Sequence, residues 1–223
     1  IGFLCYMSVP AYQVKAVTPV ETAVTPSVTF IVKEENALNV DNNVSTEQMP
    51  AQVKPLTILT LSDANTVVLR EAVTEASVSK LMLELQKKSA SLRSTDSIYL
   101  VWDTPGGSVD AGNKLISFMK ALPQKVKTVT IFAASMGFHI VESMDERIIL
   151  DSGTLMSHRA TIGGVGGELP GELVVRLNYI LGILHKMDEV AARRMHMSTR
   201  DYKEMIRDEY WVYGDNAVAA NVA

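Results

Sequence analysis

The chain has 223 residues, of which 47% are hydrophobic and 21% charged, so it is long and apolar enough to bury one sizeable core. Its formal net charge of -4 disfavours a nucleic-acid-binding surface, and its single cysteine, Cys5, excludes an intrachain disulfide. The sequence contains no CxxC or HExxH pattern that would indicate a metal site, and no cofactor is expected.

The N-terminal region differs in composition from the rest. Residues 1–16 begin with a mostly apolar stretch and contain small and β-branched residues of the kind a signal peptidase reads. We therefore expect either a signal-peptide remnant or an N-terminal arm there. Residues 17–55 are rich in Val, Thr, Pro, Asn and Glu with weak periodicity, which predicts an extended linker with one strand at 28–32. The main domain is expected at residues 56–223.

From residue 56 onward, strand-like and helix-like segments alternate. Short apolar and β-branched runs predict strands at 56–61, 66–70, 98–102, 126–133, 147–150 and 154–158. Helical periodicity and end signals predict helices at 76–92, 109–122, directly after residue 135, at 170–197, and after a cap at Ser198. Strands separated by helices indicate an α/β fold with a mainly parallel sheet and right-handed crossovers.

The sequence Ala-Ala-Ser-Met-Gly follows the strand predicted at 126–133. Small residues at Ala133 and Gly137 suit a sharp strand-to-helix turn with Ser135 at its corner, because a larger Cβ would meet the crossing backbone. Such a turn exposes the Ser135 hydroxyl and leaves the Met136 amide free at a helix N-terminus. The segment therefore predicts a nucleophile and half of an oxyanion hole, although an ordinary small-residue turn would have the same composition.

A second loop that could bind a ligand is Asp-Thr-Pro-Gly-Gly-Ser, after the strand predicted at 98–102. The adjacent glycines Gly106 and Gly107 allow a tight turn with free N–H groups, and the helix that follows Ser108 adds its positive end. The loop lacks the lysine of a phosphate-binding P-loop and the glycine spacing of a dinucleotide site. An anion or a developing oxyanion is the ligand that it suits.

Taken together, these two motifs resemble the Clp protease proteolytic subunits, which are serine peptidases of the ClpP/crotonase fold. The resemblance rests on Pro-Gly-Gly-Ser-Val, the downstream Ala-Ala-Ser-Met-Gly, the strand 154–158, the glycine-rich 163–167, and Arg-Asp-Glu-Tyr-Trp at 207–211. It extends from about residue 56 to the C-terminus. It implies repeated β-β-α units with a protruding handle helix, and a serine endopeptidase that hydrolyses unfolded proteins or peptides in an oligomeric chamber.

The resemblance also implies the functional residues. Ser135, His158 and Asp208 correspond to the catalytic triad, although Asp201 and Glu209 lie close to Asp208 in the sequence. The oxyanion donors would be the amides of Gly106 and Met136. The substrate path would involve Gly107, Ser108, Thr161, Ile162 and Gly163, with an apolar side chain before the cleaved bond.

The assembly and partners follow from the same resemblance. The helix predicted at 170–197 matches the handle that joins two stacked heptameric rings, and an AAA+ unfoldase ATPase is the expected partner, in the cytoplasm. Export is the alternative if residues 1–16 are a signal-peptide remnant. Two positions depart from the family: Ile131 replaces a usual glycine, and Val101 replaces one of two aromatics in the ATPase-docking pocket, where Tyr99 remains.

Two other functions remain open from the residues. Signal peptide peptidases of the SppA/SohB type share the fold and use a serine–lysine dyad, and Lys186 lies at a suitable separation from Ser135 in the long helix. In that scheme His158 has no role. A non-catalytic, crotonase-like scaffold subunit is the third interpretation, and it gives no role to the serine at the turn.

Overall fold

The computed structural model describes residues 27–32, 57–163 and 167–223, and the chain divides into two compact units, residues 1–62 and 63–223. In the first unit, β1 (Ser27–Val32) pairs antiparallel with β2 (Thr57–Ser62). The strands expected at 28–32 and 56–61 are therefore present. The remainder of the expected arm and linker lies outside the described residues.

The second unit is built on a five-stranded sheet with the order β3-β4-β5-β6-β7. β3 (Thr66–Leu69), β4 (Ser97–Thr104), β5 (Lys125–Ala134) and β6 (Glu146–Ser157) are parallel, and β7 (Tyr210–Tyr213) pairs antiparallel with β6. The expected α/β fold with a mainly parallel sheet is confirmed. Because the parallel strands end at the same edge, the segments after β4, β5 and β6 lie near one another.

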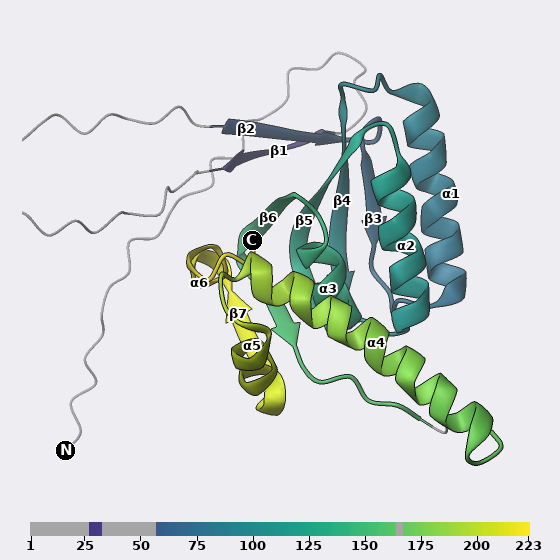
Figure 1. Ribbon diagram of the computed structural model, residues 1–223. Helices are drawn as coiled ribbons and strands as arrows, with labels where there is room; N and C mark the ends of the chain where they lie inside the picture. Colours follow the sequence, from purple (N-terminus) through teal and green to yellow (C-terminus); the bar gives the residue numbers. More distant parts are fainter. Residues whose placement is uncertain (1–26, 33–56, 164–166) are drawn as a thin grey trace, which may run out of the picture. The chain divides into compact units, whose positions relative to one another are not determined.

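Helices connect and flank the strands. They are α1 (Glu75–Ser91), α2 (Val109–Ala121), α3 (Met136–Glu142), α4 (Gly171–Arg194), α5 (Thr199–Met205), the 3-10 turn η1 (Ile206–Asp208) and α6 (Gly214–Ala219). Figure 1 shows α1 and α2 side by side next to the strands, while the long α4 extends past them. No helix among the described residues is long and apolar enough to span a membrane.

Local sequence explains where the helices begin. Thr74 forms a reciprocal capping box with Ser77 at the start of α1, and the Ser108 hydroxyl accepts a 3.2 Å bond from the Ala111 amide at the start of α2. The expected cap at Ser198 is also present, because its hydroxyl accepts a hydrogen bond from the amide of Asp201 at 3.1 Å. Ser108 is therefore used structurally, as well as lying beside the glycine turn.

Two boundaries differ from expectation. The strands predicted at 147–150 and 154–158 form one continuous strand, β6, whose pairing with β5 shifts register between Thr130 and Phe132. The extra residues of β6 are absorbed by this irregularity instead of forming a separate turn. The long helix ends at Arg194, before the predicted residue 197, because His196 adopts a positive φ of 53°.

The core lies between the sheet and its helices. Its largest fully buried side chains include Trp102 from β4, Leu115 from α2, Phe138 from α3 and Leu155 from β6, together with Tyr202 from α5. The Tyr202 hydroxyl is 2.7 Å from the hydroxyl of Ser157, the last residue of β6. This bond ties α5 to the strand end from which His158 emerges.

Candidate active site

Ser135 lies at the corner between β5 and α3, as the small-residue pattern predicts. Its backbone has φ 55° and ψ -119°, a conformation that a residue with a side chain adopts at a strained turn. The amide of Ser135 donates to the carbonyl of Met156 on β6 at 2.8 Å, which fixes the turn against the neighbouring strand. A Cβ at the following Gly137 would lie 2.7 Å from Cγ2 of Thr104, so the turn requires glycine there.

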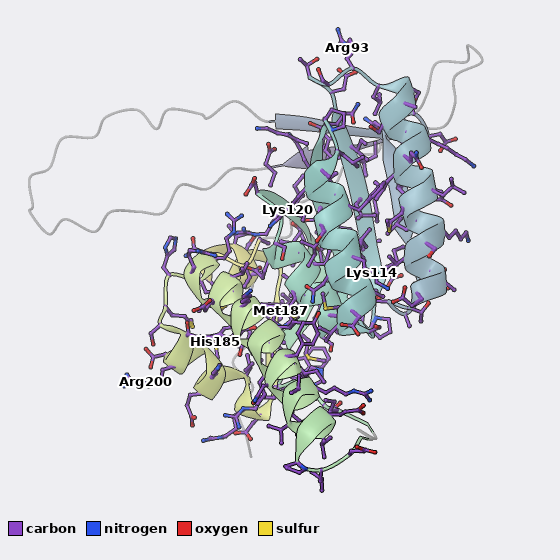
Figure 2. The ribbon with its side chains drawn as sticks, turned by 45° about the vertical axis from the view of Figure 1, so that its right-hand side comes forward. Arg93, Lys114, Lys120, His185, Met187 and Arg200 are labelled. Atoms are coloured by element: carbon purple, nitrogen blue, oxygen red, sulfur yellow. The ribbon has the colours of Figure 1, made fainter. Side chains whose placement is uncertain are left out.

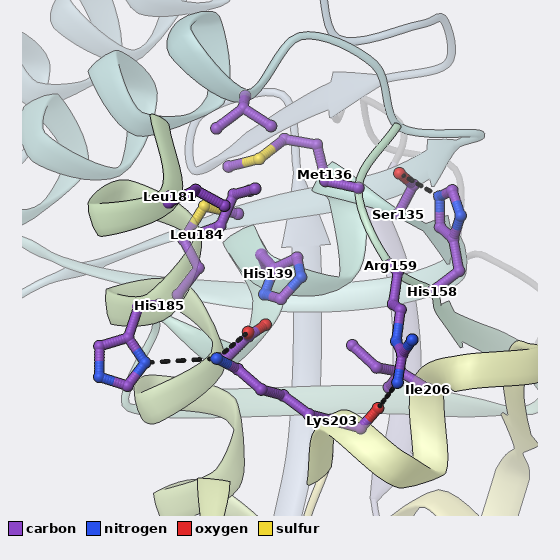
Figure 3. A pocket seen from close by; sticks show the side chains of 14 residues that line it. Ser135, Met136, His139, His158, Arg159, Leu181, Leu184, His185, Lys203 and Ile206 are labelled. Carbon is purple, nitrogen blue, oxygen red and sulfur yellow. Dashed lines mark hydrogen bonds and ion pairs between the residues drawn. The ribbon is translucent and has the colours of Figure 1, made fainter. Parts of the chain in front are cut away.

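His158 follows the end of β6 and faces the serine. Its Nε2 lies 2.8 Å from the Ser135 Oγ, which is a hydrogen bond of ordinary length (Figure 3). If Nε2 accepts the serine proton, the other ring nitrogen, Nδ1, carries a hydrogen. The structure thus brings together the nucleophile and the base that the sequence predicts.

Asp208, the expected third member of the triad, pairs with Arg207 and not with His158. Its side chain is 78% exposed and Oδ2 accepts a 3.1 Å bond from Nε of Arg207. Among the described residues, no hydrogen bond joins Asp208 to His158. The structure therefore brings Ser135 and His158 together but leaves Asp208 paired with its sequence neighbour.

Glu209 lies between Asp208 and the start of β7. In the antiparallel pairing of β6 and β7, Met156 faces Trp211 and Ser157 faces Tyr210. This pairing ends at Tyr210, and Glu209, which has a positive φ of 70°, lies outside the strand. The Trp211 indole N–H donates to Oε2 of Glu209 at 2.9 Å, so one carboxylate oxygen is held. Asp208 and Glu209 are both exposed, and neither is hydrogen-bonded to His158 in the part of the chain that the structure describes.

The glycine turn after β4 packs directly against the nucleophile. A Cβ at Gly106, which has φ 88°, would lie 2.7 Å from Cβ of Ser135 and 2.8 Å from the amide nitrogen of Met136. The amide of Gly106 is engaged, because it donates to Oγ1 of Thr104 at 3.2 Å. The amide of the next residue, Gly107, makes no hydrogen bond within the described part of the chain.

A cavity of about 230 Å³ opens beside the serine. One part of its wall is apolar and comes from α2, α3, α4 and η1: Val109, Met136, Leu181, Leu184, Met187 and Ile206. At Met187 this wall joins α2, because Nδ2 of Asn113 lies 3.8 Å from the Met187 sulfur. Figure 2 shows Met187 on α4. Another part of the wall is polar and comprises His139, Arg159, His185, Asp188 and Lys203.

His139 lies on α3, the helix that follows Ser135. In the structure it is 8% exposed and lines the cavity. Burial, and secondly the nearby His158, lower the pKa of His139 to about 4, so its imidazole is neutral at pH 7. His139 is therefore a polar group of the cavity wall and not a second base for Ser135.

The remaining candidate residues are distributed as follows. Thr161, Ile162 and Gly163 are exposed on the segment that follows His158. Lys186, the base of the alternative dyad, is exposed on α4 and is absent from the cavity wall, whereas its neighbours His185 and Met187 belong to that wall. Within the described residues, no group of three or more His, Cys, Asp or Glu side chains could hold a metal ion.

Comparison with known proteins gives two concordant results. The sequence model of the Clp protease family matches residues 52–221. Two similar curated relatives are the ATP-dependent Clp protease proteolytic subunits of Streptococcus pyogenes serotype M5 (strain Manfredo) and Streptococcus equi subsp. equi (strain 4047). Each is 27% identical over 128 residues, which cover 56% of this chain and 65% of the relative. The matched region thus spans slightly less than two thirds of the relatives' length.

Proposed function

The chain belongs to the Clp protease family, and on that premise we propose that it is a serine endopeptidase that hydrolyses peptide bonds of unfolded proteins or peptides. The observation that carries this proposal is the 2.8 Å contact between the Ser135 Oγ and Nε2 of His158 at a strained strand-to-helix turn. A nucleophile and its base are within hydrogen-bond reach, which is the geometry that acyl transfer by serine requires.

The chemistry follows from that contact. His158 takes the Ser135 hydroxyl proton while Oγ attacks the carbonyl carbon of the peptide bond, which gives a tetrahedral oxyanion. His158 then donates the proton to the departing amine, and an acyl-serine ester remains. A water molecule, deprotonated by the same imidazole, attacks the ester carbonyl and releases the carboxylic acid product with Ser135 restored.

The oxyanion requires backbone donors beside Ser135. We assign the amide of Met136, at the N-terminus of α3, as the first donor, as the resemblance implies. For the second donor the glycine turn offers Gly106, which is bonded to Thr104, and Gly107, whose amide is free among the described residues. The Gly107 amide is the better candidate, because it donates to a substrate oxyanion without first breaking an existing bond.

The third member of the triad is a carboxylate that holds the Nδ1 hydrogen of His158. We propose Asp208 for this role, as the resemblance implies, and Glu209 is the alternative, since neither carboxylate is bonded to His158 among the described residues. Asp208→Asn should lower kcat by several orders of magnitude, about 10⁴-fold, whereas Glu209→Gln should have a small effect. The reverse ranking would assign the role to Glu209.

Assembly is part of the same proposal. Val174, Val175 and Tyr179 are exposed along the N-terminal half of α4, and exposed apolar surface of this kind favours burial against another subunit. We propose that the protein forms a homo-oligomeric chamber, with stacked heptameric rings as the resemblance implies. An AAA+ ATPase that supplies unfolded polypeptide is the proposed partner, in keeping with the ATP-dependent relatives.

The experiment that tests the function is labelling of the purified protein with a fluorophosphonate, followed by mass-spectrometric mapping of the modified residue. Labelling at Ser135, lost in Ser135→Ala and in His158→Ala but retained in Lys186→Met, supports the proposed triad chemistry. Loss of labelling in Lys186→Met with retention in His158→Ala would instead establish the serine–lysine dyad. Absence of any labelling in the assembled protein would indicate a non-catalytic subunit.

A further inference from the structure

The residues on either side of His158 are both hydrogen-bonded to the same short helix. Ser157, the residue before it, has its hydroxyl 2.7 Å from the hydroxyl of Tyr202 on α5. Arg159, the residue after it, donates from Nη2 to the backbone carbonyl of Lys203 at 3.1 Å (Figure 3). Because Tyr202 and Lys203 are consecutive residues of α5, the strand end that carries the proposed base is joined to one point of that helix from both sides.

The same helix leads to the carboxylate segment. α5 has seven residues and continues without a break into η1, where Ile206 is 2% exposed and anchors the turn in the core. Asp208 is the last residue of η1. A displacement of α5 at Tyr202 would therefore carry the start of the carboxylate segment with it. The position of α5 relative to the end of β6 decides how far the carboxylate lies from the imidazole.

We propose that Tyr202 is a positioning residue, whose bond to Ser157 sets the distance between the strand end that carries His158 and the segment that carries Asp208. The proposal rests on the proposed peptidase function and adds a residue that the resemblance does not imply. Tyr202 is absent from the cavity wall, so it acts through the two segments that it joins and not through contact with a substrate.

The bond between the two hydroxyls is suited to this role. Ser157 and Tyr202 are both 0% exposed, and within the described residues each hydroxyl has only the other as a hydrogen-bond partner. An apolar pair in the same space would pack without the cost of removing two hydroxyls from water. The hydroxyl pair adds a fixed distance and direction, because a hydrogen bond weakens steeply when its geometry changes. Its specific contribution is therefore to geometry.

The buried bond is also the more constant of the two links to α5. The Arg159 bond is exposed, so water competes for both of its partners. Burial raises the pKa of the Tyr202 hydroxyl above its ordinary value of 10.0, although the bond to Ser157 opposes that shift. The Tyr202 hydroxyl therefore keeps its hydrogen at neutral pH, and the bond is not lost by titration.

The test separates positioning from stability with Tyr202→Phe, Ser157→Ala and the double variant, measured on the assembled full-length protein. Each single change leaves one buried hydroxyl unpartnered and should lower Tm by about 3 °C or more. Each should also lower kcat for peptide hydrolysis by about tenfold or more, with KM changed by less than about twofold.

The double variant gives the decisive comparison. It leaves no hydroxyl unpartnered, so Tm should return toward the value of the unmodified protein. The directed bond is still missing, so kcat should stay low by about tenfold or more. A kcat that recovers together with Tm would show that the bond serves stability alone, and it would overturn the proposal.

A second measurement asks whether Tyr202 acts through the carboxylate. Tyr202→Phe is combined with Asp208→Asn, or with Glu209→Gln if that variant shows the larger loss of activity. A residue that positions the carboxylate has nothing to position once the carboxylate is removed, so Tyr202→Phe should then change kcat by less than about twofold. Equal losses in the two backgrounds would contradict the proposal.

Tyr213→Phe is the matched control, because it removes the same hydroxyl at an exposed position of β7, and it should leave kcat and Tm unchanged. Failure of the positioning role and failure of the function give different results. If a fluorophosphonate labels Ser135 and folded Tyr202→Phe hydrolyses peptides at the full rate, the peptidase function holds and the positioning role does not. If the unmodified protein shows no labelling and no hydrolysis, both are lost.

Discussion

The two helices that border the cavity, α3 and α4, are held in opposite ways. All seven residues of α3 are buried, from Met136 to Glu142, whereas only Ala191 and Ala192 are buried among the 24 residues of α4. The core therefore fixes the helix that follows Ser135. The helix on the other side of the cavity lies mostly outside that core. Ser135 is positioned by the fold, and assembly of the kind proposed above would act on the cavity through α4.

The prediction with the greatest expected effect concerns Gly106, which packs against the start of the buried helix α3. In Gly106→Ala, the new Cβ would lie 2.7 Å from Cβ of Ser135 and 2.8 Å from the Met136 amide, at a φ of 88°. Displacement of the nucleophile turn by about 1 Å should lower kcat/KM by ~10²-fold or more. Peptide hydrolysis and labelling rates measure the loss, with circular dichroism as the check on folding. A folded variant of full activity would show that the turn is not held as tightly as described.

The next prediction addresses the exposed half of α4. Val175 is 69% exposed and Tyr179 is 67% exposed, so a charge at either position is tolerated by the isolated subunit but not by an apolar subunit interface. The double change Val175→Glu and Tyr179→Glu should shift the protein from an oligomer toward a species of 24.4 kDa, as measured by light scattering.

Gln86→Glu on α1 is the control for the charge change on α4, because it introduces a charge of the same sign at an exposed position and should leave assembly intact. If the α4 variant keeps its mass while the circular dichroism spectrum is unchanged, this surface is not an interface.

A third prediction concerns Glu142, the buried carboxyl at the end of α3. Burial raises its pKa from 4.5 to about 8, against the opposing effects of Arg147 and Arg194, and neither carboxyl oxygen has a hydrogen-bond partner among the described residues. Between pH 4.5 and 8 the folded protein holds a proton that the unfolded chain has released, so stability falls as the pH rises through this range.

Glu142→Gln should therefore raise Tm, by ~5 °C or more at pH 8 and by little at pH 4.5, as measured by thermal unfolding at several pH values. Glu71→Gln, at an exposed side chain, should leave the pH profile as it is. A constant effect of Glu142→Gln across the pH range would show that Glu142 is ionised in the folded protein.

The smallest expected effect is again on α4. A Cβ at Gly182 would meet no atom within 4 Å, so Gly182→Ala adds helix propensity without a clash. Unfolding should become less favourable by about 1 kcal/mol, which corresponds to a Tm increase of ~2–4 °C for a chain of this size. Destabilisation by this change would mean that the glycine is required for close packing against a neighbouring subunit.

Much of the fold could be predicted from the sequence, because apolar periodicity determines which faces are buried. The strands β4 and β5 and the helices α1 and α2 begin and end within one or two residues of the expected positions. The continuity of β6 could not be predicted. Asp-Ser-Gly is a common turn sequence, and only pairing with β5 on one side and β7 on the other keeps it within a strand.

The candidate site was predictable to a similar extent. Ser135 follows from small residues next to it in the chain, which is local information. His158 meets Ser135 through the pairing of β5 with β6, in which Ala134 lies beside Met156, and the sequence does not specify that register. The cavity role of His139 is also non-local, because it requires α4 and α5 to bring Asp188 and Lys203 to the same wall.

The two tryptophans of the chain differ in exposure, and this difference has an optical consequence. Trp102 is fully buried in the core, whereas Trp211 is 52% exposed, stacks on Phe132 at 6.5 Å and donates its indole hydrogen to Glu209. A soluble quencher such as acrylamide should therefore extinguish the emission of Trp211 and spare that of Trp102. Because Trp211 lies on β7, which pairs with the end of β6 that precedes His158, the quenchable fluorescence becomes a built-in reporter of events beside the proposed base.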